Sequence, residues 1–139
     1  MGEIRVEIGL ENFGDRYMCL EKKIQENEIK RYEMEAIVAT GAVMLVLPQD
    51  VVEELGLKVF RTVIVTYADE RKEERPVAGT VTIIIGTRFM NTDCIVGPPA
   101  SEALIGQVIL EELDLIPDCQ RQTLTPRPES PIYPSLKLK

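Results

Sequence analysis

Apolar and polar residues alternate in two stretches of the N-terminal half, and such alternation is typical of a half-buried strand. The stretches are residues 3–10 (EIRVEIGL) and residues 31–38 (RYEMEAIV). Between them, the sequence Asn-Phe-Gly-Asp at residues 12–15 has the composition of a turn. The middle of residues 17–38 also fits a short helix, but we favour a strand that enters Ala39.

Two apolar runs flank a Thr-Gly pair and end in Pro48, which predicts a strand, a tight turn and another strand. Residues 49–56 then carry the signals of a short helix. Asp50 stands at the N-cap position, Glu53 at the capping-box position, and Gly56 at the position of a left-handed terminator.

Two further strand-like runs, residues 60–67 and 75–85, are separated by a charged segment, which predicts a long β-hairpin with an exposed tip. Another strand, residues 93–96, leads through Gly-Pro-Pro into residues 101–113. The second half of that segment has helical spacing, and four of its residues are available for one buried face: Ile105, Val108, Ile109 and Leu113.

Residues 126–139 are rich in proline and cannot join a central sheet, so we expect an extended tail in a polyproline-like state. A disordered terminus is favoured, and a sharper hypothesis places the tail in a cleft with Ile132, Tyr133 and Leu136 as anchors. Residues 1–125 are long enough for one domain. Short strands with two brief helices indicate the all-β class, as a small closed or sandwiched fold.

The composition argues against several classes of function. The 23 acidic and 16 basic residues give a net charge of −7 without a basic patch, so nucleic acid is not an expected partner. The absence of histidine removes Ser-His-Asp and Cys-His systems and His-ligated metals, and we expect no metal and no cofactor. The three cysteines are far apart, which favours reduced thiols. No apolar run approaches the roughly 18 residues of a membrane span, so we expect a cytoplasmic protein without a membrane partner.

The segment Ala-Ile-Val-Ala-Thr-Gly-Ala, residues 36–42, is similar to the Ala-Leu-Val-Asp-Thr-Gly-Ala signature of retropepsin-like aspartic proteases, with Ala39 in the place of the aspartate. Residues 47–57 resemble the first helix of that family, and the hairpin ending at Gly79 resembles its flap. Leu104-Ile105-Gly106 resembles the element that completes the active-site loop. The resemblance is to the bacterial single-lobe branch and covers roughly residues 3–125.

The resemblance implies a closed β-barrel of the acid-protease fold with one lobe per chain. It also implies a symmetric homodimer in which two aspartates share a proton and activate water toward a peptide or protein substrate, without a cofactor. Thr40 would hold the paired turns together, and Gly41 would permit close approach of the backbones. The implied substrate-binding residues are Ala42, Tyr67, Ala68, Asp69, Glu70 and Arg71.

Ala39 departs from the signature at the decisive position, because a methyl group can neither take a proton from water nor hydrogen-bond a carbonyl. We therefore expect this chain to be inactive as written. Asp50 and Asp93 are better explained as a helix cap and a loop residue than as substitutes. An engineered inactivating change is favoured over a natural pseudoprotease that binds peptides or acts as a scaffold, and the sequence leaves both open. A small barrel without a cleft function is a third, weaker hypothesis.

Overall fold

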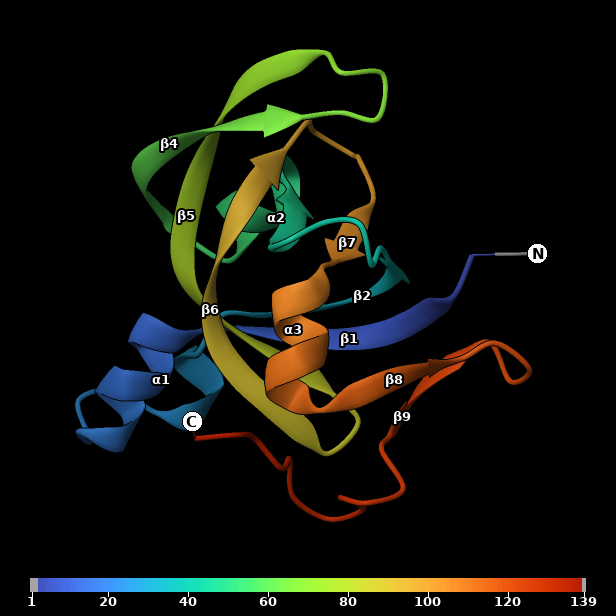
Figure 1. Ribbon diagram of the computed structural model, residues 1–139. Coiled ribbons are helices and arrows are strands. Elements are labelled where there is room, and N and C mark those ends of the chain that lie inside the picture. The colour runs from blue at the N-terminus through green and yellow to red at the C-terminus, as the bar shows by residue number, and fades with distance from the viewer. Residues whose placement is uncertain (1–2, 139) are drawn as a thin grey trace.

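Six strands close into a barrel, and a seventh strand extends it as one arm of a hairpin (Figure 1). The computed structural model describes residues 3–138. The barrel strands follow the spatial order β1-β2-β7-β3-β6-β5, and pairing of β1 with β5 closes the ring. Their bounds are Arg5–Asn12 (β1), Arg31–Val38 (β2), Leu45–Pro48 (β3), Lys72–Ile85 (β5), Arg88–Gly97 (β6) and Ala103–Ile105 (β7). The all-β class and the closed barrel are thus confirmed.

The remaining elements are peripheral to this ring. Within residues 3–138, strand β4 pairs with β5 and with no other strand, and β8 pairs with β9 in a separate two-stranded sheet. The helices are short, and η1 is a single 3₁₀ turn. The bounds are Lys58–Thr66 (β4), Leu115–Asp118 (β8), Thr123–Pro126 (β9), Phe13–Leu20 (α1), Glu26–Glu28 (η1), Gln49–Glu54 (α2) and Gln107–Leu113 (α3).

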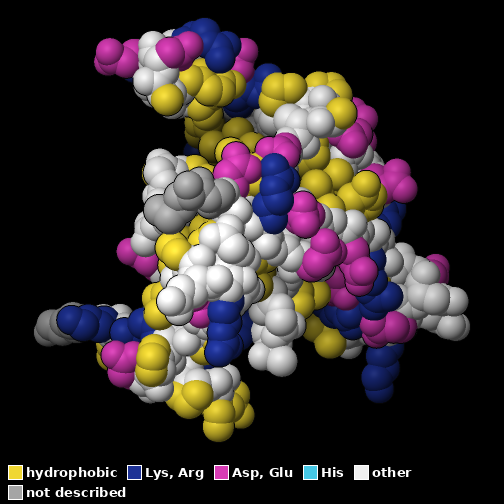
Figure 2. Space-filling view, turned by 90° about the vertical axis from the view of Figure 1, so that its right-hand side faces the viewer, with side chains coloured by type: hydrophobic (Ala, Val, Ile, Leu, Met, Phe, Trp, Pro, Cys, Tyr) yellow, Lys and Arg dark blue, Asp and Glu magenta, His cyan; other side chains and the backbone are white. Residues whose placement is uncertain are grey.

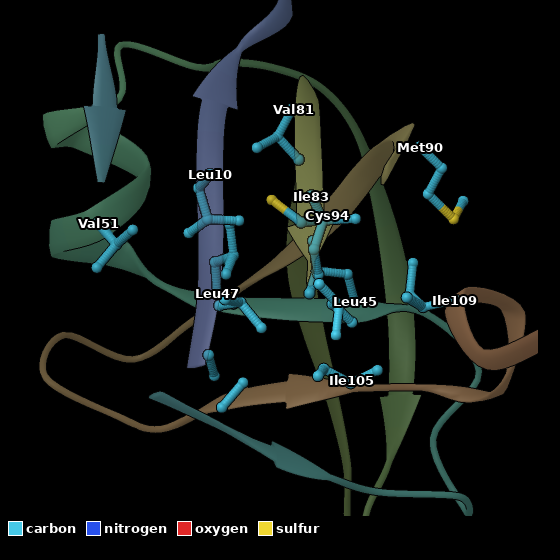
Figure 3. Packing of buried hydrophobic residues seen from close by; sticks show 14 of the residues in the cluster. Leu10, Leu45, Leu47, Val51, Val81, Ile83, Met90, Cys94, Ile105 and Ile109 are labelled. Carbon is cyan, nitrogen blue, oxygen red and sulfur yellow. The ribbon is translucent and has the colours of Figure 1, made fainter. Parts of the chain in front are cut away.

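The hydrophobic core fills the barrel because alternate residues of each strand point inward. Leu45 and Leu47 of β3, Ile83 of β5 and Ile105 of β7 are fully buried. Figure 3 shows these side chains meeting Ile109 of α3 in one cluster. The helix α3 thus covers one side of the core.

The cysteines are free thiols, and they differ in exposure. Cys94 is buried in the core, Cys19 is half-buried and Cys119 is exposed. Burial and the neighbouring Asp93 raise the pKa of Cys94 to about 12. The thiol of Cys94 therefore stays protonated and is part of the packing.

The turn predicted at residues 12–15 is wrong, because the helix α1 begins there. The side chain of Asn12 accepts a hydrogen bond from the backbone N–H of Asp15 at 3.0 Å, which satisfies one of the free donors at the helix start. Arg16 then pairs with Glu11 at 2.8 Å and with Glu26 at 2.8 Å. Since Glu11 lies on β1, these ion pairs attach the helix to the barrel.

The helix α2 is confirmed, but its N-cap prediction is wrong. Pro48 is the cap residue and makes no side-chain bond to the helix. The carboxylate of Asp50 instead accepts from the backbone N–H of Ala100 at 2.7 Å, and Glu53 accepts from the Gln49 side chain at 3.1 Å. Gly56 has φ +66°, so its role as a left-handed terminator is confirmed.

Two C-terminal expectations also change. Ile109 and Leu113 are buried as predicted, but Val108 is 41% exposed and Ile105 belongs to β7. The reason is that α3 begins only at Gln107, and this start determines which of its residues face the core.

Two strand predictions differ from the structure as well. The β8–β9 hairpin has no counterpart among the predicted elements, and β6 begins at Arg88 rather than near residue 93.

The proline-rich tail folds back onto the end of α3, where the carboxylate of Asp114 binds it. That carboxylate accepts hydrogen bonds from the Arg127 guanidinium, the Ser130 hydroxyl and the backbone N–H of Ser135. Arg88, itself buried, donates to the carbonyls of Leu113 and Asp114 at 2.8 and 3.0 Å and to that of Ser130. The tail therefore has a defined attachment at a buried polar cluster.

The tail's proposed anchors lie at the surface of the chain. Ile132 is 73% exposed, Tyr133 80% and Leu136 59%. Occupation of an active-site cleft by these side chains stays a prediction.

Replacing Leu45 with alanine tests the core. We expect Leu45→Ala to lower the free energy of unfolding by about 2–5 kcal/mol, because a fully buried leucine leaves a cavity. Phe89→Ala, at a side chain that is 67% exposed, should change it by less than about 0.5 kcal/mol. Urea denaturation followed by circular dichroism measures both, and equal losses would contradict this core assignment.

Asp114→Asn tests the attachment of the tail through its pH dependence. The Arg127 guanidinium, the Ser130 hydroxyl and the Ser135 N–H hold the pKa of Asp114 well below its ordinary value of 3.8. Its contribution to stability is therefore full above that value and is lost as the pH falls through the lowered folded-state pKa. We expect Asp114→Asn to lower the denaturation midpoint at pH 7, and this deficit should shrink as the pH falls below 3.8. Glu129→Gln, at an exposed carboxyl in the same segment, is the control, and a deficit independent of pH would contradict the assignment.

Candidate active site

The strand β7 lies between β2 and β3 in the sheet. Since β2 and β3 follow each other in the chain, the segment that joins them, residues 39–44, must pass around β7. Val38 of β2 pairs in parallel with Ile105, and Val46 of β3 pairs antiparallel with Leu104. The backbone N–H of Ala39 then donates to the carbonyl of Ile105 at 2.9 Å. The turn at residues 39–42 is thereby joined to the Leu-Ile-Gly element by a backbone hydrogen bond.

Gly106, directly after β7, must be a glycine because the backbone of residues 43 and 44 passes close to it. A Cβ atom built on it would lie 2.5 Å from the carbonyl oxygen of Met44 and 2.7 Å from that of Val43, so no side chain fits. Directly after it, the N–H groups of Gln107 and Val108 donate to the carbonyls of Ala42 and Val43 at 2.8 and 3.0 Å. The start of α3 thus holds the far side of the turn.

The turn itself faces outward. The N–H of Ala42 donates to the carbonyl of Ala39 at 2.9 Å and closes it. Thr40 and Gly41 are exposed, whereas Ala39 and Ala42 are half-buried. A Cβ atom on Gly41 would meet no atom within 4 Å, so the chain's own fold does not require glycine there. An exposed Thr-Gly is therefore held rigidly by backbone bonds at the barrel surface.

The site as it stands contains no acid or base at residue 39. The carboxylate of Asp50 accepts a hydrogen bond from the backbone N–H of Ala100, as described above. Asp93 lies within β6 and not in a loop, so that part of the prediction is wrong. Among residues 3–138, no three His, Cys, Asp or Glu side chains come together as a metal-binding group.

The β4–β5 hairpin projects from one end of the barrel, and the sequence-predicted tip residues form its turn (Figure 1). Tyr67 closes the turn through its N–H to the carbonyl of Arg71 at 2.9 Å, and the Arg71 guanidinium lies 4.2 Å from the centre of the Tyr67 ring. The Tyr67 hydroxyl donates to Glu73 at 2.6 Å, and this bond raises the pKa of Tyr67. Ala68, Asp69 and Glu70 are exposed.

Within the described residues, no hydrogen bond joins this tip to the turn at residues 39–42. Figure 2 shows the hairpin projecting at the top of the molecule, with the surface hollowed beneath it. The structure brings residues 39–42 and 104–106 into direct contact and leaves Tyr67–Arg71 on a separate projection. A role of the tip in binding substrate stays a prediction.

Sequence analysis missed a groove along the exposed side of α3. It has a volume of about 870 Å³ and runs from Thr40 past Val108 and Glu111 to Leu136 of the tail. The return of the tail to Asp114 creates one wall, and no local sequence pattern signals such a distant contact.

Within residues 3–138, the structure contains no helix with the length and apolar character to cross a membrane.

The barrel, the inserted strand and the outward Thr-Gly turn together define a single lobe of the acid-protease type. Residues 26–112, more than half of the chain, match the model of the gag-polyprotein putative aspartyl protease family. The chain belongs to this family. The match contains the turn, the hairpin tip and the Leu-Ile-Gly element, whereas β1, β8 and β9 lie outside it. No curated protein matches the chain.

A pair of glycine substitutions tests the close contact of Gly106 with the backbone of residues 43 and 44. We expect Gly106→Ala to lower the free energy of unfolding by about 1–3 kcal/mol or more, because the added Cβ collides with the Met44 carbonyl. Gly9→Ala adds the same group at ordinary contact distance, 3.5 Å from Ile84, and should change it by less than about 0.5 kcal/mol. Chemical denaturation measures both, and a tolerated Gly106→Ala would show that β7 does not pack against residues 43–44 as described.

Proposed function

We propose that this chain is one lobe of a homodimeric aspartic endopeptidase, present here in a catalytically silent form. The observation that carries the proposal is the turn at residues 39–42, which the Ile105 carbonyl and the start of α3 hold in an aspartyl-protease lobe. Residue 39 is the proposed catalytic position. Leu104, Ile105 and Gly106 support its turn from behind.

The chemistry requires two carboxylates close together. One of them, ionised, takes a proton from water, while the other, protonated, hydrogen-bonds the scissile carbonyl. A single chain supplies one such turn, so the second must come from a twofold-related copy, with the site on the symmetry axis. Thr40 and Gly41 of the two copies would then meet at that axis.

The exposed residues around the turn support a second copy as the partner. Thr40 and Gly41 are exposed, Val43 is 67% exposed and Val108 is 41% exposed. The N–H of Val108 bonds the carbonyl of Val43, so the backbones of these two residues are adjacent beside the turn. Uncovered apolar residues beside a rigid turn fit a surface that a partner covers.

Ala39 removes both carboxylates of such a dimer at once, so the chain would bind a peptide without cleaving it. The same residue favours a second candidate function, a pseudoprotease that binds peptides or acts as a scaffold. An engineered change is supported by the intact signature on both sides of Ala39. The codon for residue 39 in the source gene distinguishes the two origins, since an aspartate codon there means that alanine was introduced.

Restoring the carboxylate tests the proposal. We expect Ala39→Asp to cleave members of a peptide library at mildly acidic pH and to be blocked by a statine-type inhibitor, because the paired aspartates can then share a proton. Ala39→Asn, which has a similar shape but no ionisable group, is the matched control and should stay inactive. Cleavage is read by mass spectrometry of the library.

The oligomeric state completes the test. Sedimentation at micromolar concentration should give a dimer for the chain and for Ala39→Asp. A folded Ala39→Asp dimer without inhibitor-sensitive cleavage would contradict the protease function and favour the peptide-binding alternative. A monomer would favour a barrel without a cleft function.

A further inference from the structure

The β4–β5 hairpin lacks the support that the barrel strands have. Strand β4 pairs with β5 and with no other strand of the described chain, and most of its residues are exposed. A two-stranded ribbon is only marginally stable by itself in water. The hairpin therefore needs a contact with the barrel to hold one orientation.

The two faces of the hairpin differ. Val63 and Val65 of β4, which lie opposite Arg75 and Glu73 of β5, are half-buried together with those partners. On the other face, Ile64 is 66% exposed. The face that carries Glu73 and Arg75 is thus turned toward the barrel.

Arg75 makes the contact that joins this inner face to the barrel. Its Nε donates to the carbonyl of Val96 at 2.9 Å, and its side chain is only 19% exposed. Val96 lies near the end of β6 and pairs with Leu47 of β3, the strand that follows the turn at residues 39–42. This side-chain bond thus connects the inner face of the hairpin to the end of β6, next to β3.

A chain of side-chain contacts continues from Arg75 to the tip. The Arg75 guanidinium lies 3.7 Å from the Glu73 carboxylate, which accepts the Tyr67 hydroxyl at 2.6 Å. Arg71 then lies over the Tyr67 ring. Arg75 is therefore the inner end of a series that fixes the tip relative to the hairpin.

We propose that Arg75 is a positioning residue that sets the orientation of the β4–β5 hairpin relative to the barrel through its hydrogen bond to Val96. The part of the inference that concerns peptide binding rests on the proposed protease function. The part that concerns hairpin mobility does not depend on it. Arg75 acts through the hairpin and needs no contact with the reacting atoms.

The test compares Arg75→Met, which keeps a long side chain but no donor, with Arg75→Lys, which keeps a charged donor. Arg61→Met is the matched control, because Arg61 is an exposed arginine of β4. Hydrogen exchange is measured by mass spectrometry on the chain with Ala39. We expect Arg75→Met to speed exchange in residues 58–75 by about tenfold, Arg75→Lys to restore part of the protection, and residues 81–85 to be unaffected. Unchanged exchange in Arg75→Met overturns the inference whatever the activity.

The second readout uses the same substitutions in the Ala39→Asp form. We expect Arg75→Met to raise KM about tenfold with a smaller effect on kcat, Arg75→Lys to recover part of the loss, and Arg61→Met to leave both unchanged. A mobile hairpin with an unchanged KM overturns the role in substrate binding. If Ala39→Asp cleaves no peptide, the proposed function and this role both fail, while the exchange result still decides whether Arg75 holds the hairpin.

Discussion

The close approach of Gly106 to the carbonyls of Val43 and Met44 is the constraint on which the candidate site depends. It lets β7 enter between two strands that are consecutive in the chain, so that Ile105 bonds Ala39 and the start of α3 bonds residues 42 and 43. Each side of the Thr-Gly turn is then held by backbone hydrogen bonds. A side chain at residue 106 would push the two segments apart and release the turn.

The tip of the β4–β5 hairpin is held by side-chain contacts rather than by a close backbone approach. These contacts join near neighbours, with Arg71 over the Tyr67 ring and the Tyr67 hydroxyl on Glu73. The base of the hairpin is joined to the barrel by the pairing of β5 with β6, and the bond from Arg75 to Val96, residues that are distant in the chain, extends this connection toward the tip. A locally rigid tip on a projecting ribbon can move as one body, which is compatible with the proposed role of the hairpin in binding a peptide.

The tail and α1 show where sequence patterns mislead. Proline excludes the tail from a sheet, but it does not prevent attachment: Asp114, in the left-handed conformation, gathers Arg127, Ser130 and Ser135 around one carboxylate. At residues 12–15 the same Asn that favours a turn favours a helix cap equally, and the ion pairs of Arg16 with Glu11 and Glu26 favour the helix. In both places a distant partner decides between local alternatives.

Local sequence patterns were sufficient to predict the all-β class, the strand entering Ala39, the hairpin, the second helix and the position of the signature turn. Alternation and glycine placement are local, and they are set by which side chains must leave water and where the backbone must turn. The position of β7 between β2 and β3, the exposure of Val108 next to the backbone of Val43, and the contact of Arg75 with Val96 depend instead on the folded arrangement of the whole chain. These contacts join residues far apart in the chain, and no local pattern carries the geometry that brings them together.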